Sequence, residues 1–137
     1  MRVRISSAIL EQIMSLAAAD PHEVCGLLLG REGAILNVRP AVNVAPDPAR
    51  HFELDPAVLI AAHRAARAGG PAILGHYHSH PSGHAEPSAT DAANAAPDGS
   101  LWLIVGSGAA RLWVAGRGQG QGQAGEVRFT PARLDIM

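Results

Sequence analysis

The amino-acid sequence predicts an α+β fold with a mixed, mostly antiparallel β-sheet flanked by helices. Three observations predict it: short apolar runs typical of strands outnumber the helical segments, turn residues separate several of these runs as in hairpins, and two segments carry clear helix-start signals. The chain has 137 residues, of which 47% are hydrophobic and 17% charged. We therefore expect one compact domain spanning residues 1–137.

The first half of the chain is predicted to contain two helices around a central hairpin. The expected elements are a helix from Ser6 or Ser7 to before Pro21, strands at 24–29 and 35–38, a loop at 40–50, a short strand at 51–54, and a helix from Asp55 to Gly69. Asp55 and Pro56 form a strong start signal, because an aspartate cap precedes a proline at the first helical position.

The second half is predicted to contain mainly strands. The expected elements are a strand from Ala72 into His78, a short helix from Ser88 to about Ala95, strands at 101–105 and 110–114, a Gly/Gln-rich loop at 116–125, and a last strand at 127–130 that closes the sheet. Ser88 and Asp91 stand in the spacing of a capping box at the start of the short helix.

Composition excludes several classes of protein. With 11 basic and 12 acidic residues, the net charge is -1, whereas nucleic-acid-binding proteins normally carry a basic face. The single cysteine, Cys25, cannot form an internal disulfide, and no apolar run is long enough to span a membrane. We therefore expect a cytoplasmic protein that binds neither nucleic acid nor a membrane.

A cluster of metal-binding residue types is the main functional signal. Residues 76–84 contain four of the 7 histidines, and His78 and His80 lie two apart at the end of a predicted strand, so that both imidazoles project from one face. Asp91, at the start of the next helix, could fold back to supply a third ligand. Two histidines and one carboxylate leave the fourth tetrahedral position for water, which is typical of catalytic zinc.

Two further residues could complete the chemistry. Glu23 precedes a buried strand and could act as general base, since a metal lowers the pKa of water but something must still accept the proton. Ser88 lies one helical turn from Asp91 and could donate its hydroxyl to the oxyanion of a tetrahedral intermediate.

These residues resemble the motif of the JAMM (MPN-plus) zinc metallopeptidase family, in its small bacterial form. The matching pattern is Glu23, His78-x-His80-Pro81 and Ser88-x-x-Asp91, and the surrounding segments 21–28, 52–56 and 75–81 are similar as well. As a composite of five spaced positions, this pattern is far more specific than two neighbouring histidines.

The resemblance implies a fold, a cofactor and a substrate class. The fold would be the JAMM/MPN fold, which is similar to that of cytidine deaminases. By similarity, His78, His80 and Asp91 would bind Zn2+, Glu23 would be the general acid and base, and Ser88 would stabilise the oxyanion. The family cleaves peptide or isopeptide bonds after the C-terminal Gly-Gly of ubiquitin-like proteins. Because the chain lacks long insertions, a compact sulfur carrier is the expected partner, with its tail paired along a sheet edge.

Other interpretations of the same residues stay open. Asp91 could serve only as a helix cap, and Glu23 could be a solvated turn residue. His76 could be a polar strand residue or contact a metal ligand or the substrate, His84 a surface residue or a stray ligand, and Cys25 an inert buried thiol.

Two other functions also remain open. His78, His80 and Glu86 approach the ligand order of a cupin-type iron or manganese enzyme, although no histidine follows His84. A non-catalytic interaction module that retains a metal site is the second. The oligomeric state is not predicted.

Overall fold

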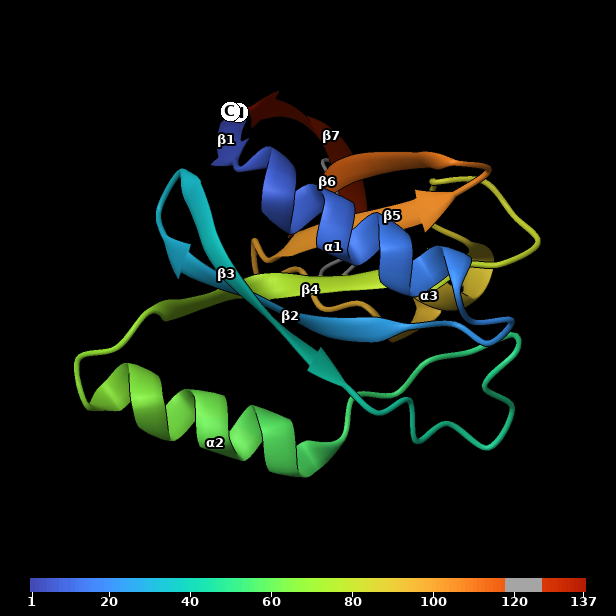
Figure 1. Cartoon of the computed structure of the whole chain (residues 1–137), viewed down its shortest axis with the longest axis horizontal. Helices are drawn as coiled ribbons and strands as arrows, with labels where there is room; N and C mark the ends of the chain where they lie inside the picture. The colour runs from blue at the N-terminus through green and yellow to red at the C-terminus, as the bar shows by residue number, and fades with distance from the viewer. Residues whose placement is uncertain (118–126) are drawn as a thin grey trace.

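Strands from the two ends of the chain meet in one closed sheet. The computed structural model describes residues 1–117 and 127–137. The elements are β1 (Arg2–Ile5), α1 (Ser7–Ala18), β2 (Cys25–Arg31), β3 (Ala34–Ala41), α2 (Pro56–Arg67), β4 (Ala72–His80), α3 (Ala89–Asn94), β5 (Leu101–Gly106), β6 (Ala109–Arg117) and β7 (Val127–Ile136). The order around the barrel is β1-β3-β2-β4-β5-β6-β7, and β7 returns to β1 (Figure 1).

The sheet is mixed, as the sequence predicts, but its closure into a barrel was not predicted. Within the described residues, four strand pairs are antiparallel and three are parallel. The parallel pair β4 and β5 is joined by a connection that contains α3, whereas hairpins join β2 to β3 and β5 to β6. β2 and β4 pair with each other and with one further neighbour each, so neither strand leaves a free edge.

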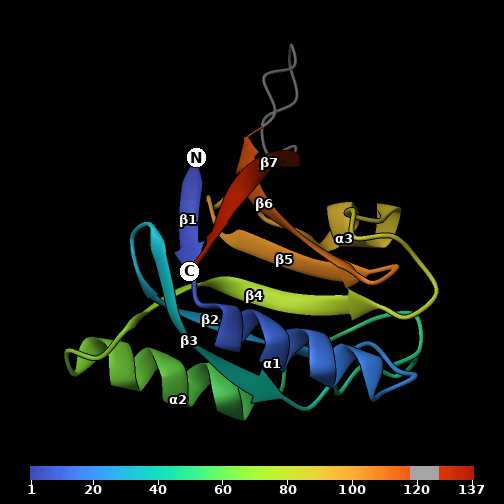
Figure 2. The ribbon, with the colours of Figure 1, turned by 45° about the horizontal axis from the view of Figure 1, so that its top comes forward.

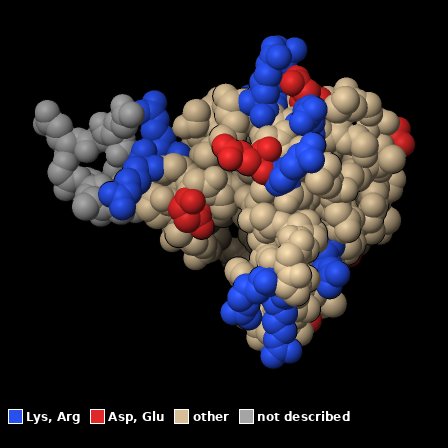
Figure 3. All heavy atoms as spheres, turned by 90° about the vertical axis from the view of Figure 1, so that its left-hand side faces the viewer, with Lys and Arg blue, Asp and Glu red and all other residues tan. Residues whose placement is uncertain are grey.

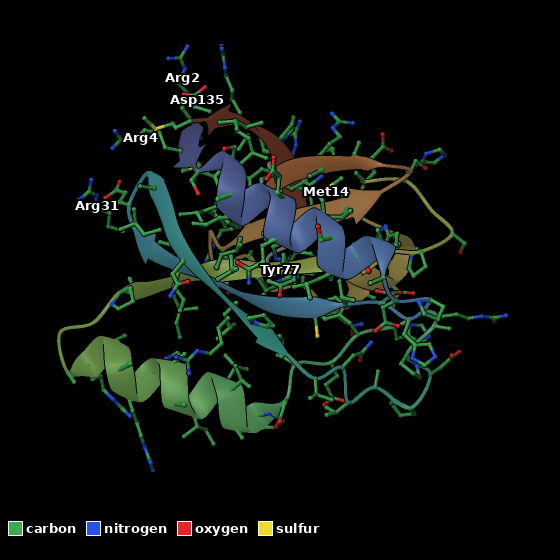
Figure 4. All side chains as sticks on the ribbon, in the orientation of Figure 1. Arg2, Arg4, Met14, Arg31, Tyr77 and Asp135 are labelled. Atoms are coloured by element: carbon green, nitrogen blue, oxygen red, sulfur yellow. The ribbon has the colours of Figure 1, made fainter. Side chains whose placement is uncertain are left out.

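Helices cover both faces of the sheet around β2. Leu28 belongs to the larger core beneath α1, together with Ile13 and Tyr77, whereas Leu27 and Leu29 belong to a smaller core beneath α2. Because neighbouring side chains of a strand point to opposite faces, β2 contributes to both cores and is buried almost throughout. Figure 2 shows α1 and α2 on either side of this part of the sheet, and Figure 4 labels Tyr77, which is buried in the larger core, and Met14, which packs against that core.

The predicted helix starts are confirmed. The Ser6 hydroxyl accepts a hydrogen bond from the amide of Ile9, and the Asp55 carboxylate accepts one from Ala57. Strands β3, β5, β6 and β7 are each longer than predicted, and β1 was not predicted, because four residues carry too short an alternation. The predicted loop at 116–125 begins inside β6, and its residues 118–125 lie outside the described residues.

Two predictions around residues 40–54 are wrong. Pro40 does not begin a loop but lies within β3, opposite Gly26. No strand forms at 51–54, where a single bridge joins Leu54 to Asn43. The reason is that the Asn43 side chain, rather than a neighbouring strand, satisfies the backbone of this segment: its amide donates to the carbonyl of His51 and its oxygen accepts from the amide of Glu53.

Arginine supplies all the basic side chains, and they are dispersed. In Figure 4, Arg2, Arg4 and Arg31 extend from the end of the molecule where β1 meets the turn between β2 and β3, and Asp135 lies beside Arg2. Figure 3 shows separate basic groups on this side, with acidic groups between them, rather than one continuous basic face. Among the helices in the described part of the chain, none is long and apolar enough to cross a membrane.

Candidate metal centre

The end of β4 brings two imidazoles together. His78 and His80 project from the same face, and their Nε2 atoms lie 3.1 Å apart. The His78 side chain is completely buried, whereas that of His80 keeps 12% of its surface exposed. Burial lowers the pKa of His78, so its imidazole is neutral and has a lone pair available for a ligand.

Asp91 reaches both imidazoles from the first turn of α3. Its Oδ2 atom lies 3.3 Å from Nε2 of His78 and 3.1 Å from Nε2 of His80. The same oxygen accepts a hydrogen bond from the amide of Ser88, and the Ser88 hydroxyl accepts one from the amide of Asp91, which completes the predicted capping box. The helix cap and a bond to a metal ion would therefore be compatible, because one carboxylate oxygen has two lone pairs, one for the Ser88 amide and one for the ion.

The pKa of Asp91 shows how strongly the imidazoles affect its carboxylate. Burial alone would raise this pKa, but hydrogen bonds with His78 and His80 and with the Ser88 amide hold it well below its ordinary value. The hydrogen bond with Asp91 in turn raises the pKa of His80. Asp91 is thus an anion at neutral pH, as a metal ligand must be.

Glu23 completes the cluster from the segment before β2. A carboxylate oxygen of Glu23 and one ring nitrogen each of His78 and His80 all lie within 4.8 Å of one another. The residue is 6% exposed. Burial raises the pKa of Glu23 to about 7, and this effect exceeds the opposing influence of His80. A carboxylate with a pKa near neutrality can both accept and return a proton at physiological pH.

Two residues that the sequence analysis did not single out hold Glu23 in place. Ser79 points away from the histidines, and its hydroxyl accepts a hydrogen bond from the amide of Val24 at 2.9 Å. The Asn43 side chain donates to the carbonyl of Glu23 at 2.9 Å. It also donates to the carbonyl of His51 and accepts from the amide of Glu53, which fixes the segment that follows β3. An asparagine at a strand end before a proline-rich loop is a weak signal for such a role, since only the folded chain shows which backbone groups it reaches.

The connection between β4 and α3 is anchored to the hairpin of β5 and β6. The Ser107 hydroxyl donates to the carbonyl of Gly83, and the Trp113 ring donates to the carbonyl of Ala85. A side chain at Gly106 would meet the backbone of His84 at 2.5 Å, so glycine is required for this close approach. The His84 carbonyl is thereby held 2.8 Å from Nδ1 of His80.

The other candidate residues take different positions. The His84 ring contacts the Ser107 hydroxyl rather than the cluster, and Glu86 pairs with Arg111 at 3.3 Å with both side chains at least half exposed, so the cupin-type ligand set does not form. The Ser88 hydroxyl accepts from Asp91 and retains its own proton for donation. Cys25 is buried in β2, and burial raises the pKa of its thiol to about 11, which leaves it an unreactive thiol.

His76 is the residue whose position the sequence left most open. Its Nε2 atom lies 3.1 Å from Nδ1 of His78, and its ring packs against Phe52 and against the edge of Trp102. Burial lowers the pKa of His76 to about 3, so its imidazole is neutral.

Two hollows adjoin the cluster, and Glu23 lines both of them. One, of about 520 Å3, lies between the segment 45–53 and α3, with His76 and Trp102 in its lining. The other, of about 670 Å3, lies between residues 49–51 and the connection 80–88, and includes His80 and Ser88. Glu23, Arg50, His51 and Thr90 line both hollows, so the two lie next to each other beside the cluster.

The donor set fits a zinc ion. In a tetrahedral zinc site with bonds of about 2.0–2.1 Å, neighbouring ligand atoms lie roughly 3.3 Å apart. The separations of 3.1 to 3.3 Å among His78, His80 and Asp91 agree with that spacing. An ion held by these three side chains would have room for a fourth ligand, because the hollows that Glu23 lines adjoin them.

The stability of the metal-free protein should depend on pH through Glu23. Because the pKa of Glu23 rises from 4.5 to about 7 on folding, its contribution to stability is fully present below about pH 4.5 and is lost as the pH rises through 7. We expect Glu23→Gln, measured by urea unfolding with a chelator present, to be more stable than the wild type by about 1–2 kcal/mol at about pH 8, and this gain to vanish near pH 4.5. Other titrating groups are common to both proteins and cancel. A gain that is equal at both pH values would contradict this prediction.

Comparison with known proteins agrees with the geometry. Residues 6–116 match the family model Prok-JAB, the prokaryotic homologues of the JAB domain. The chain is 39% identical over 100 residues to a desampylase of Haloferax volcanii, covering 71% of this chain and 72% of that protein. It is 41% identical over 71 residues to the "Probable TtuB-protein conjugate cleaving protease" of Thermus thermophilus, covering 52% of this chain and 47% of that protein.

A solved structure shares the whole fold. The solution structure of a protein from Desulfitobacterium hafniense superposes with a TM-score of 0.77 at 27% identity, covering 100% of this chain and 94% of that chain. The resemblance to the JAMM family seen in the sequence is confirmed by the family model, which spans most of the residues that build the barrel and the whole histidine and carboxylate cluster. On these grounds the chain belongs to the family of prokaryotic JAB-domain proteins.

Proposed function

We propose that the protein is a zinc metallopeptidase that hydrolyses the peptide or isopeptide bond after the C-terminal Gly-Gly of a ubiquitin-like or sulfur-carrier protein. The observation that carries the proposal is the position of Glu23, a carboxylate with a pKa of about 7 within 4.8 Å of the two imidazoles. The names of the relatives, two of which are a desampylase and a protease for TtuB-protein conjugates, support a conjugate or a carrier as the substrate.

The chain's own residues divide the work of hydrolysis. His78, His80 and Asp91 would hold the zinc, which when bound supplies Lewis acidity to the scissile carbonyl and lowers the pKa of water. Glu23 accepts the proton of the attacking water and returns it to the leaving amine. The Ser88 hydroxyl, which keeps its proton while its oxygen caps α3, donates to the oxyanion.

The groove, rather than a sheet edge, suits an extended tail. β2 and β4 are hydrogen-bonded on both sides, so a tail paired along a sheet edge, as the sequence analysis expects, would have to use another strand. The two hollows that share Glu23 offer a path across the cluster instead, with one part for the tail and one for the leaving group.

We also propose that the reaction occurs in the cytoplasm and that residues 1–137 act as one domain. A single buried thiol requires no oxidising compartment. The barrel needs both β1 and β7, which come from opposite ends of the sequence, so the site and its scaffold belong to one folding unit.

Mass spectrometry of a carrier protein tests this function. A β-grasp sulfur carrier with a short extension beyond its Gly-Gly, incubated with the zinc-loaded protein, is expected to lose the extension after the second glycine. A chelator should prevent the cleavage, and zinc should restore it. Binding of the carrier with micromolar affinity but without cleavage would favour a non-catalytic interaction module, and cleavage unaffected by the chelator would refute a metal-dependent reaction.

A further inference from the structure

The Nδ1 atoms of the two proposed imidazole ligands, His78 and His80, contact different kinds of partner. Nδ1 of His80 lies 2.8 Å from the carbonyl of His84, and Nδ1 of His78 lies 3.1 Å from Nε2 of His76. In both cases the ring nitrogen away from Asp91 is engaged, while Nε2 points toward Asp91. The partner of each Nδ1 decides where the proton of the neutral ring resides.

For His80, the partner determines which ring nitrogen carries the proton. A carbonyl oxygen can only accept, so Nδ1 of His80 carries a proton and donates it, and in the neutral ring that a metal ion binds, Nε2 has the lone pair. For His78 the partner is another imidazole, which can accept or donate. Only if Nε2 of His76 accepts can Nδ1 of His78 carry the proton and leave the lone pair on Nε2, where a metal ligand needs it.

We propose that His76 is a positioning residue, whose Nε2 accepts the Nδ1 proton of His78 and so presents the Nε2 lone pair of His78 to the metal. This inference rests on the proposed function, since it assumes that His78 is a ligand. His76 takes the place that a carboxylate or a backbone carbonyl often occupies behind a metal-binding histidine.

Packing against aromatic residues restrains the orientation of the His76 ring. His76 and His78 both lie against Phe52, with ring centroids 5.0 Å and 4.2 Å from it, and His78 is stacked on it at an interplanar angle of 17°. Trp102 contacts His76 in a T-shaped arrangement, with ring centroids 4.4 Å apart. Contacts with these two aromatic rings restrict rotation of the His76 ring, so that its Nε2 stays directed at His78.

Two substitutions separate the hydrogen bond from the packing. His76→Phe keeps an aromatic ring between Phe52 and Trp102 but removes the acceptor. His76→Gln gives up the ring but can place its side-chain oxygen near the position of Nε2. If the acceptor is what matters, the glutamine variant should retain most of a property that the phenylalanine variant loses.

The property to measure is zinc affinity, by competition with a chromophoric chelator. We expect His76→Phe to bind zinc about 10- to 100-fold more weakly than the wild type, and His76→Gln to regain most of that loss. In NMR spectra of the zinc-loaded protein, the Nδ1 proton of His78 should be protected from exchange with water in the wild type and in His76→Gln, and should exchange rapidly in His76→Phe. His76→Leu replaces His76→Phe if circular dichroism shows that the latter does not fold.

The outcomes distinguish this inference from the proposed function. Wild-type zinc affinity in the phenylalanine variant, or equal losses in the phenylalanine and glutamine variants, would overturn the role of His76 while leaving the metal site intact. Failure of the wild-type chain itself to bind zinc would overturn the metal site, and with it the proposed function.

Discussion

Replacing Glu23 with glutamine is expected to lower the rate of carrier cleavage by about 10²–10⁴-fold while the zinc content stays unchanged. The carboxylate is 6% exposed, and burial raises its pKa to about 7, the range in which a group can accept a proton from water and release it to an amine. Glutamine has nearly the same shape and keeps a polar group in the groove, but it cannot accept a proton. The loss should therefore fall on the chemical step and leave binding of the tail in place.

Single-turnover cleavage and zinc content are the measurements. Glu11→Gln is a matched control, because Glu11 is an exposed carboxylate on α1, and it should have wild-type activity. A Glu23→Gln protein that cleaves the carrier at the wild-type rate would remove Glu23 from the mechanism. A variant that loses its zinc would instead make Glu23 a ligand.

Replacing Asp91 with asparagine is expected to weaken zinc binding by more than about 100-fold, beyond the loss typical of residues behind a ligand. The Oδ2 atom of Asp91 lies 3.1 to 3.3 Å from Nε2 of both His78 and His80, and its carboxylate is negatively charged. Asparagine can still accept the hydrogen bond from the Ser88 amide, so α3 should stay capped, and the zinc-free protein should lose only the stability that comes from the charged hydrogen bonds of the carboxylate with His78 and His80. Cleavage at a fixed low zinc concentration should fall together with zinc occupancy.

Asp98→Asn is the matched control for this variant. The Asp98 carboxylate accepts a hydrogen bond from the amide of Ser100 on the surface, so the same chemical change there should leave zinc affinity unaltered. If Asp91→Asn kept wild-type zinc affinity but melted at a much lower temperature, Asp91 would be a helix cap rather than a ligand.

Local signals predict the helix starts well, because each depends on neighbours in sequence. The Ser6 cap, the start at Asp55 and Pro56, and the capping box of Ser88 and Asp91 all form as predicted. The errors lie where a distant group decides the outcome. Residues 51–54 have the composition of a strand, but the Asn43 side chain takes up their backbone groups, and no periodicity in the sequence shows that.

The candidate site, too, is predicted in part from the sequence pattern and in part seen only in the folded chain. The spacing of His78, His80, Ser88 and Asp91, with Glu23 far upstream, identifies the family from the sequence. That these groups converge within 3.1 to 4.8 Å depends on β2 and β4 being paired, which places the segment that carries Glu23 beside the end of β4. His76 shares the strand face of His78 and His80, but the sequence does not show its contact with Nδ1 of His78, on which the proposed positioning role depends.

By itself, the sequence determined the residue types of the site, the α+β composition and the positions where helices begin, since these follow from chemistry and short-range hydrogen bonding. Only the tertiary structure decided that the sheet closes into a barrel, that Ser79 and Asn43 hold Glu23, and that β2 and β4 offer a tail no free edge. The physical reason is that these features arise from pairing and packing between residues far apart in the chain, whose partners are not determined by local pattern.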